Sequence, residues 1–166
     1  TIDAATGEIS VVDNTSLDYE TTHQYVLTVQ ASDGTNTDTA AVTIDVTNVN
    51  DNAPLIDDLT TSVAEDAANT TIIANINDTN TGNDTDLDGN ALTYSITAGN
   101  DDGVLSIDAA TGVITVANNT NLDYETTSQY VLTVQASDGT NTDMAAVTID
   151  VTNANDNAPL IDDLTT

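Results

Sequence analysis

Apolar and polar residues alternate along two stretches near the end of the chain, at residues 130–136 and 145–151. A period of two residues is typical of a β-strand with one buried face. The sequence Asp138-Gly139-Thr140-Asn141 lies between the two stretches and predicts a hairpin turn. Residues 25–31 and 40–46 repeat the same pattern. The chain therefore contains two predicted antiparallel hairpins.

Shorter apolar segments predict further strands at 60–64, 70–76, 91–97, 104–107 and 113–116. A turn at Ala110-Thr111-Gly112 separates the last two, and no segment has the apolar period of an amphipathic helix. Seven short strands in about a hundred residues predict an all-β, seven-stranded Greek-key β-sandwich. An immunoglobulin domain is not expected, because the chain contains neither Cys nor Trp.

Residues 1–61 and 106–166 are near-identical copies, with 52 of 61 positions the same at an offset of 105 residues. A period this long fits an independent domain better than a short solenoid repeat. The phase of the repeat predicts three parts. We expect residues 1–54 to be the C-terminal half of one repeat, 55–159 a complete repeat and 160–166 the start of the next.

The charge of the chain is strongly one-sided, with 28 Asp and Glu residues, no Lys or Arg and a formal charge of −28. Such a charge opposes compaction and repels other polyanions. We therefore expect no contact with nucleic acid and no contact of this segment with a membrane. Carboxylates attract hard cations, which makes metal ions the expected source of compensation.

Disorder, which an acidic composition often indicates, is not expected here. The chain is 39% hydrophobic, and these residues follow the period of a strand. Paired acids such as Asp18 and Glu20 could in principle hydrolyse glycosides. No aromatic platform for a sugar accompanies them, so we expect no enzymatic activity.

Acidic motifs recur at the same phase in both copies. Leu17-Asp18-Tyr19-Glu20 returns at 122–125, Asn50-Asp51-Asn52-Ala53-Pro54 returns at 155–159, and Ala31-Ser32-Asp33 returns at 136–138. Asp86-Leu87-Asp88 and the Glu65 of Ser62-Val63-Ala64-Glu65 occur once. Short Asp and Asn side chains suit turns, and their oxygens suit calcium, which takes six to eight oxygen ligands.

This combination resembles the cadherin repeat family, and in particular the cadherin-like tandem repeats of large bacterial and archaeal surface proteins. The family pattern has an acidic residue after the first strand, an LDRE motif, a D-x-N-D-N-x-P linker, a DxD and an AxD. The resemblance covers essentially the whole chain and implies about three Ca²⁺ ions at each junction between domains. It also implies a location outside the cell, at its surface.

The resemblance assigns ligands residue by residue. Those of the junction at 48–54 are Asp18, Glu20, Asn50, Asp51, Asn52, Asp86, Asp88 and Asp138. Those of the junction at 153–157 are Glu65, Asp123, Glu125, Asn155, Asp156 and Asn157, and Asp33 is the AxD acid of the first copy. Asn48 and Asn153 stand where the family has the first linker Asp, which removes one charge from each junction. The stretch 77–85 resembles an insertion in which Asp78 or Asp84 could add a ligand, although a solvated loop is the preferred interpretation.

These motifs and the near-identity of the copies favour a calcium-rigidified structural repeat of a stalk, filament or adhesin. Its expected partners are neighbouring repeats of the same protein, with a homopolymeric filament as one possibility. Two alternatives stay open. One is direct calcium-dependent adhesion to identical domains or to glycans. The other is a filament subunit in which a neighbouring chain completes the half-repeat at 1–54.

Overall fold

The computed structural model describes residues 1–77 and 84–159 and divides the chain into two units, Thr1–Asn50 and Asp51–Thr166. The part of the chain that is described contains nine strands and one short 3₁₀ helix, Asn119–Asn121. The all-β prediction is therefore confirmed. The unit boundary lies near the predicted repeat boundary at residue 54. The predicted segment 160–166 lies outside the described residues, so the assignment of repeats stays a prediction.

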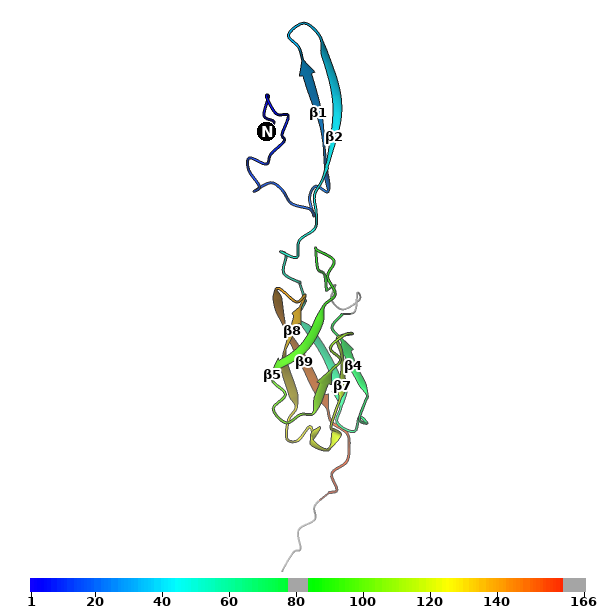
Figure 1. The fold of residues 1–166 in the computed structure, drawn as a ribbon. Coiled ribbons are helices and arrows are strands. Elements are labelled where there is room, and N and C mark those ends of the chain that lie inside the picture. The colour runs from blue at the N-terminus through cyan, green and yellow to red at the C-terminus, as the bar shows by residue number, and fades with distance from the viewer. Residues whose placement is uncertain (78–83, 160–166) are drawn as a thin grey trace, which may run out of the picture. The chain divides into compact units, whose positions relative to one another are not determined.

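The second unit is a sandwich of two sheets (Figure 1). One sheet has the order β3-β9-β8-β5, formed by Leu59–Ala64, Thr142–Thr152, Gln129–Ser137 and Thr93–Ala98. The other has the order β4-β7-β6, formed by Ile72–Asn75, Val113–Val116 and Leu105–Ile107. These strands agree with the segments that alternation predicts to within a few residues at each end. The exact number of strands in a whole repeat stays a prediction.

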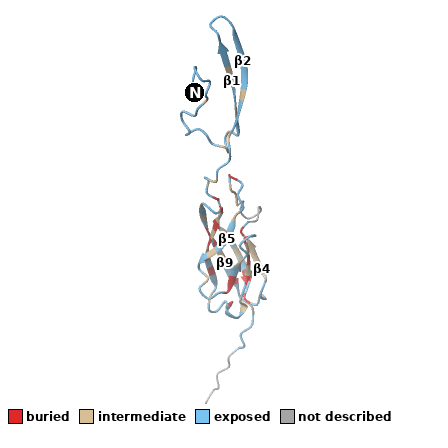
Figure 2. Cartoon of the chain, in the orientation of Figure 1, coloured by how far each residue is buried: buried red, intermediate tan, exposed pale blue. Residues whose placement is uncertain are grey.

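The core of this unit comes from the alternating residues of the two long strands. Leu132 and Val134 of β8 and Val147 and Ile149 of β9 are fully buried. They pack with Ile114 and other aliphatic residues of the facing sheet. Figure 2 shows the buried residues concentrated inside this unit. Burial of apolar area at this interface is the main stabilising contribution to the fold.

Strand β3 pairs with β9 in parallel, from Leu59 opposite Val147 to Ala64 opposite Thr152. The other paired strands of the unit are antiparallel. The turns that precede β3 and follow β8 therefore lie at one end of the sandwich. The segments that follow β3 and β9 lie at the other end. The acidic motifs occupy these two ends.

The first unit contains an antiparallel hairpin of β1, Gln24–Ser32, and β2, Thr37–Asp45. Tyr25 is paired with Ile44, as Tyr130 is paired with Ile149 in the second unit. The same sequence thus adopts the same register twice. Burial differs, however, because Leu27 is 38% exposed whereas its counterpart Leu132 is fully buried. Figure 2 shows this hairpin almost entirely in the colour of exposed residues.

Candidate calcium sites

Asp88 organises the end of the second unit at which the chain enters from residue 51. It is 8% exposed, and its carboxylate accepts hydrogen bonds from the backbone N–H groups of Asp51 and Asn52, at 3.1 and 2.8 Å. The side-chain amide of Asn52 donates to Asp88 as well, at 3.0 Å. The structure therefore brings together the linker and the DxD motif, as the resemblance implies.

Asp138 lies in the hairpin turn at this end and is 9% exposed. Its carboxylate accepts from the backbone N–H groups of Thr140 and Asn141, at 2.6 and 2.7 Å. The side chain of Asn141 in turn donates to the backbone carbonyl of Asn52, at 3.2 Å. The β8–β9 turn is thus attached directly to the linker.

Glu65 organises the opposite end of the unit and is 6% exposed. Its Oε2 accepts from the backbone N–H of Tyr124 at 2.7 Å, and its Oε1 accepts from that of Ala154. Glu65 therefore joins three segments, namely the turn after β3, the second LDYE motif and the segment after β9.

Oxygens of Glu65, Asp123 and Glu125 lie within 4.8 Å of one another. Like charges at such separations repel one another. The chain contains no Lys or Arg that could offset this repulsion. Oxygen ligands and uncompensated negative charge are what Ca²⁺ prefers, so these residues fit the implied ion.

The first unit repeats the local geometry of these motifs. Asp18 accepts from the backbone N–H of Glu20 at 2.9 Å and from the Thr21 hydroxyl at 2.7 Å. In the second unit, Asp123 accepts from the N–H of Glu125 at 2.9 Å and from the Thr126 hydroxyl at 2.6 Å. The sequence folds each LDYE motif into the same turn.

Asp33 likewise accepts from the backbone N–H groups of Thr35 and Asn36, at 2.8 and 2.7 Å, which matches the turn at Asp138. Asn50 ends the first unit. The predicted ligands of the junction at 48–54 are therefore divided between the two units, with Asp18, Glu20 and Asn50 in the first.

Hydrogen bonds keep the motif aspartates charged. The Thr21 hydroxyl lowers the pKa of Asp18, and the Thr126 hydroxyl lowers that of Asp123. The backbone N–H of Asn36 is the main cause of the lowered pKa of Asp33. An ionised carboxylate is the form that binds a cation.

Three predicted ligands follow β9 at this end of the unit. Asn155, Asp156 and Asn157 are exposed, and the described contact among them is the bond from the Asn157 amide to the Asp156 carboxylate, at 3.0 Å. Their assignment as ligands stays a prediction.

From the sequence, Asn153 is noted only because it replaces a charged linker residue of the family pattern. Asn141 is not identified as a site residue at all. The structure gives both a role, since the Asn153 amide donates to Glu125 at 2.8 Å and Asn141 contacts the linker. The recurrence of Asn141 as Asn36 in the other copy is the signal in the sequence that points to it.

The preferred interpretation of Asp84 as part of a solvated loop is wrong. Both oxygens of its carboxylate are buried. This burial raises the pKa of Asp84, and the charge of Asp57 adds to the rise. Asp78, the other acid considered there, lies outside the described residues.

Comparison with known proteins identifies the class to which this sandwich and these acidic ends belong. The family model of the cadherin domain matches residues 1–47 and 59–152. The chain is 34% identical over 167 residues to human Protocadherin Fat 1, covering 96% of this chain and 4% of that protein. It is 41% identical over 152 residues to the Drosophila melanogaster Protocadherin-like wing polarity protein stan, covering 87% of this chain and 4% of the relative. The chain belongs to the cadherin domain family.

Solved structures agree with this assignment. The one described as "Protocadherin gammaB7 EC3-6 cis-dimer structure" has a TM-score of 0.73 and 26% identity, over 85% of this chain and 36% of that one. Mouse Cadherin-23 EC22-24 has a TM-score of 0.68 and 30% identity, over 84% of this chain and 45% of that one. The cadherin resemblance of the sequence and the β-sandwich fold are both confirmed.

Cadherin domains are extracellular repeats of adhesion-type, non-enzymatic proteins at the cell surface, and the chain is such a repeat. It spans only a few per cent of the length of the first curated relatives that it matches. Across residues 1–77 and 84–159, no helix combines the length and apolarity that crossing a bilayer requires. The bacterial or archaeal origin suggested by the sequence stays a prediction.

Proposed function

We propose that the chain is a calcium-rigidified structural repeat of an extracellular stalk, filament or adhesin. The observation that supports this most directly is the group formed by Glu65, Asp123 and Glu125, whose oxygens converge in a chain that has no Lys or Arg. The recurrence of the same LDYE and AxD turns in both units supports it further.

At the junction around 48–54, the proposed ligands are Asp18, Glu20, Asn50, Asp51, Asn52, Asp86, Asp88 and Asp138. The six carboxylates among them would balance the charge of three Ca²⁺ ions. At the opposite end of the second unit, Glu65, Asp123 and Glu125 would hold calcium together with Asn155, Asp156 and Asn157. Asp33 would serve the corresponding position of the first unit. The ion supplies charge compensation and a fixed set of bonds between loops.

Ions that bind only the folded form stabilise it by RT ln(1 + [L]/Kd), which is about 2.7 kcal/mol at a hundredfold excess over Kd. Extracellular calcium modules bind with Kd values on the order of 10⁻⁴–10⁻³ M. We therefore expect the chain to melt at a higher temperature in millimolar calcium than in EGTA. Equal melting temperatures and equal small-angle scattering in the two conditions would refute the proposal.

Asp51→Ala tests the assignment of ligands. We expect weaker calcium binding by titration calorimetry, because Asp51 is a proposed ligand whose backbone is held by Asp88. Asp45→Ala is the matched control, since Asp45 is an exposed strand residue and its replacement removes the same charge. If the two variants bind calcium equally well, Asp51 is not a ligand.

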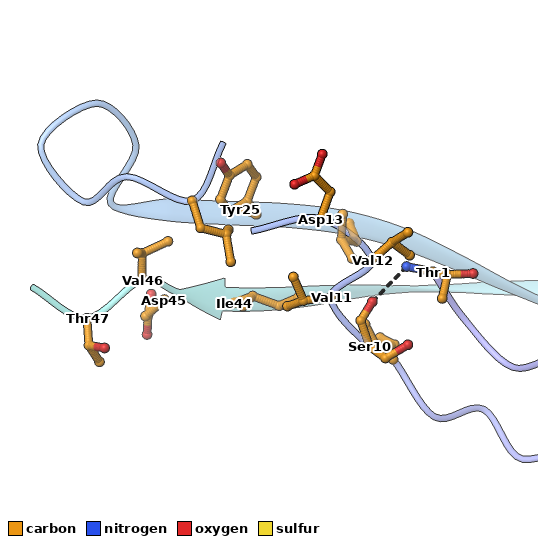
Figure 3. Close-up of a pocket in the computed structure, with 13 residues that line it drawn as sticks. Thr1, Ser10, Val11, Val12, Asp13, Tyr25, Ile44, Asp45, Val46 and Thr47 are labelled. Atoms are coloured by element: carbon orange, nitrogen blue, oxygen red, sulfur yellow. Dashed lines mark hydrogen bonds between the residues drawn. The ribbon is translucent and has the colours of Figure 1, made fainter. Parts of the chain in front are cut away.

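The open face of the first hairpin favours a second candidate, assembly by complementation. Thr1, Val11, Tyr25, Leu27 and Ile44 line a hollow of about 670 Å³ on this unit (Figure 3). Counterparts of these hairpin residues in the second unit are buried against segments within 55–105. A segment of that type from a neighbouring chain would fit the face, with main-chain bonds along the strand edge.

Sedimentation velocity of the chain over a range of concentrations separates these functions. Complementation predicts concentration-dependent association that Leu27→Asp abolishes, because a charge in the hollow opposes burial. A monomer at all concentrations argues against it and leaves the structural repeat in place.

Direct adhesion is the remaining alternative, and the structure of Protocadherin gammaB7 EC3-6, described as a cis-dimer, shows that copies of a relative can associate. Beads coated with the chain should aggregate in calcium and separate in EGTA if identical domains bind one another. Beads that stay dispersed in calcium exclude homophilic adhesion by this segment.

A further inference from the structure

The two near-identical copies differ at nine of their 61 positions, and the differences cluster in one part of the repeat. Six of the nine fall within residues 106–121, which include strands β6 and β7 of the second unit. All six are exposed or half-buried there. The segment in which the copies differ most therefore forms part of the surface.

The differing residues of the two strands share the outer face of the sheet β4-β7-β6. Thr115 is paired with Ile72 on one side and with Ser106 on the other. Directly paired residues project to the same face of a sheet, and the hydroxyls of Ser106 and Thr115 lie 2.9 Å apart. Val113 is two residues from Thr115 in β7 and projects to this side as well. We call Ile72, Ser106, Val113 and Thr115 the outer patch.

The inner face of the same strands does not differ between the copies. Ile107, Ile114 and Val116 alternate with the residues of the outer patch, and each is identical to its counterpart in the first copy. Ile114 and Val116 are fully buried, and Ile107 packs against the core. The differences are thus confined to the side of the sheet that a partner can reach.

The difference at Val113 changes the chemistry of the outer patch. Val113 stands where the first copy has Glu8, so the second copy has an apolar side chain in place of a charge. Ile72 beside it is 68% exposed. Exposed apolar groups contribute favourable free energy only when a partner removes them from water. Unselected change on a solvated face gives no reason to replace a charge with an apolar residue.

The outer patch lines a hollow of about 520 Å³, together with residues that include Thr70, Asp108 and Thr111. Of the described residues that line this hollow, Asp108 alone carries a charge. Its Oδ1 already accepts from the backbone N–H groups of Ala110 and Thr111. The hollow therefore offers mainly hydroxyl and apolar surface, in a chain with 28 acidic residues.

Charge indicates which partner fits this surface. Two copies of the chain each have a formal charge of −28 and repel one another wherever their acidic residues face. They can approach with least repulsion where both are uncharged. Apolar and hydroxyl surface is also complementary to itself, as a contact between identical patches requires. A basic partner would instead be attracted to the acidic ends of the sandwich.

We propose that the outer patch binds the same patch of a second copy of this chain, and that the residue at position 113 determines which repeats take part. The first copy has the same local pairing, since the Ser10 N–H donates to the Thr1 carbonyl at 3.0 Å. Glu8 stands in that pairing at the position of Val113, and like charges across an interface oppose association. The contact would provide the direct adhesion considered above, and it therefore rests on that part of the proposed function.

Val113→Glu tests the outer patch with the residue that the first copy has at the equivalent position. The patch covers three short strands, so a single contact is weak, and beads that carry many copies detect it through avidity. In calcium, beads with the unchanged chain should aggregate, and Val113→Glu beads should stay dispersed. Val131→Glu is the matched control, because Val131 is 52% exposed in β8 of the other sheet and its variant adds the same charge.

Ile72→Ser removes apolar area from the outer patch without adding charge, and its beads should stay dispersed as well. This variant decides the matter if Val113→Glu does not fold, which its melting temperature reveals. The proposal is overturned if unchanged beads stay dispersed in calcium, or if beads with the folded patch variants aggregate as unchanged beads do. Dispersed Val131→Glu beads would also overturn it, because added charge anywhere would then prevent association.

Beads of two colours test whether position 113 selects the partner. Unchanged beads mixed with Val113→Glu beads should form aggregates of the unchanged colour alone, because a contact between identical patches needs an uncharged patch on both sides. Aggregates that contain both colours equally would contradict this selection.

Leu27→Asp and calcium binding distinguish failure of this contact from failure of the proposed function. Leu27→Asp beads should aggregate, and loss of aggregation in this variant but not in Val113→Glu would assign association to the first hairpin instead. Val113→Glu should bind calcium as the unchanged chain does. If calcium does not change the melting temperature but Val113→Glu still abolishes aggregation, the calcium function is wrong and the contact stands. If calcium raises the melting temperature and Val113→Glu beads aggregate, the contact is wrong and the calcium function stands.

Discussion

Asp108 shows how single acidic residues close the turns of this chain. It follows β6, and its Oδ1 accepts from the backbone N–H groups of Ala110 and Thr111 and from the Thr111 hydroxyl, at 2.9 to 3.0 Å. Asp3 makes the corresponding backbone bonds in the first unit, to Ala5 and Thr6. The hydroxyl of Thr111 is the main cause of the lowered pKa of Asp108.

The lowered pKa of Asp108 predicts how the contribution of this turn to the stability of the fold depends on pH. A carboxyl whose pKa is lower in the folded state stabilises the fold above its unfolded pKa, which is about 3.9. This stabilisation is lost as the pH falls through the folded pKa. In EGTA, Asp108→Asn should therefore melt below the unchanged chain at pH 7, and the difference should shrink toward pH 2. A difference that stays constant over this range contradicts the prediction.

Gly99, which follows β5, has a φ of +85° and no room for a side chain. A Cβ atom there would lie 2.0 Å from the carbonyl oxygen of Val131. Gly99→Ala should lower the free energy of unfolding by roughly 3 kcal/mol or more, from the positive φ and the clash with backbone together. Gly103 is the control, with a φ of +68° and no neighbouring atom within 4 Å of the position that a Cβ atom would take. Urea denaturation should give a loss of only about 1–2 kcal/mol for Gly103→Ala.

The ligand motifs could be predicted from the sequence because they lie in short turns that depend on local residues. Asp18 and Asp123 accept the same hydrogen bonds, although the two units that contain them differ in structure. Asp84 could not be predicted in this way. Its carboxylate interacts with Tyr94 and Asp57, which are not its neighbours in sequence, and alternation in the sequence does not indicate such contacts.

At the level of elements, comparison of the two hairpins shows that strand pairing and the burial of a strand face have different causes. Strands β1 and β2 share their sequence and register with β8 and β9, so local sequence determines the hairpin. Whether one face is buried depends instead on the segments that cover it. In the second unit these are the strands of the facing sheet, β4, β6 and β7, and the sequence of the hairpin contains no information about their presence.

Leu132→Ala and Leu27→Ala, at equivalent positions of the two hairpins, test whether burial differs between the two units. Leu132 is fully buried, and its truncation should cost about 2–5 kcal/mol. Leu27 is 38% exposed, so its truncation should cost far less. Hydrogen exchange measured by mass spectrometry locates each effect, to β8 and β9 or to β1 and β2. Equal losses in the two variants would show that Leu27 is buried in solution, as complementation requires.

At the level of the whole molecule, the formal charge of −28 opposes folding wherever no cation compensates it. Raising the ionic strength from about 0.01 M to about 0.15 M shortens the Debye length from about 30 to about 8 Å. In EGTA, the melting temperature should therefore rise with sodium chloride. In saturating calcium the rise should be smaller, because bound ions already neutralise the clustered acids. Calorimetric scans that show the same salt dependence in both conditions contradict this account.

The parallel pairing of β3 with β9 has a mechanical consequence. The chain enters the sandwich of the second unit at the Leu59 end of β3 and leaves it at the Thr152 end of β9, which are opposite ends of one ladder. Tension along the polypeptide would therefore load these backbone hydrogen bonds in shear, so that they must break together. A hairpin pulled at its two open ends would lose its bonds one by one. The arrangement makes forced unfolding slow, which suits a module that carries a pulling load between a surface and whatever is attached to it.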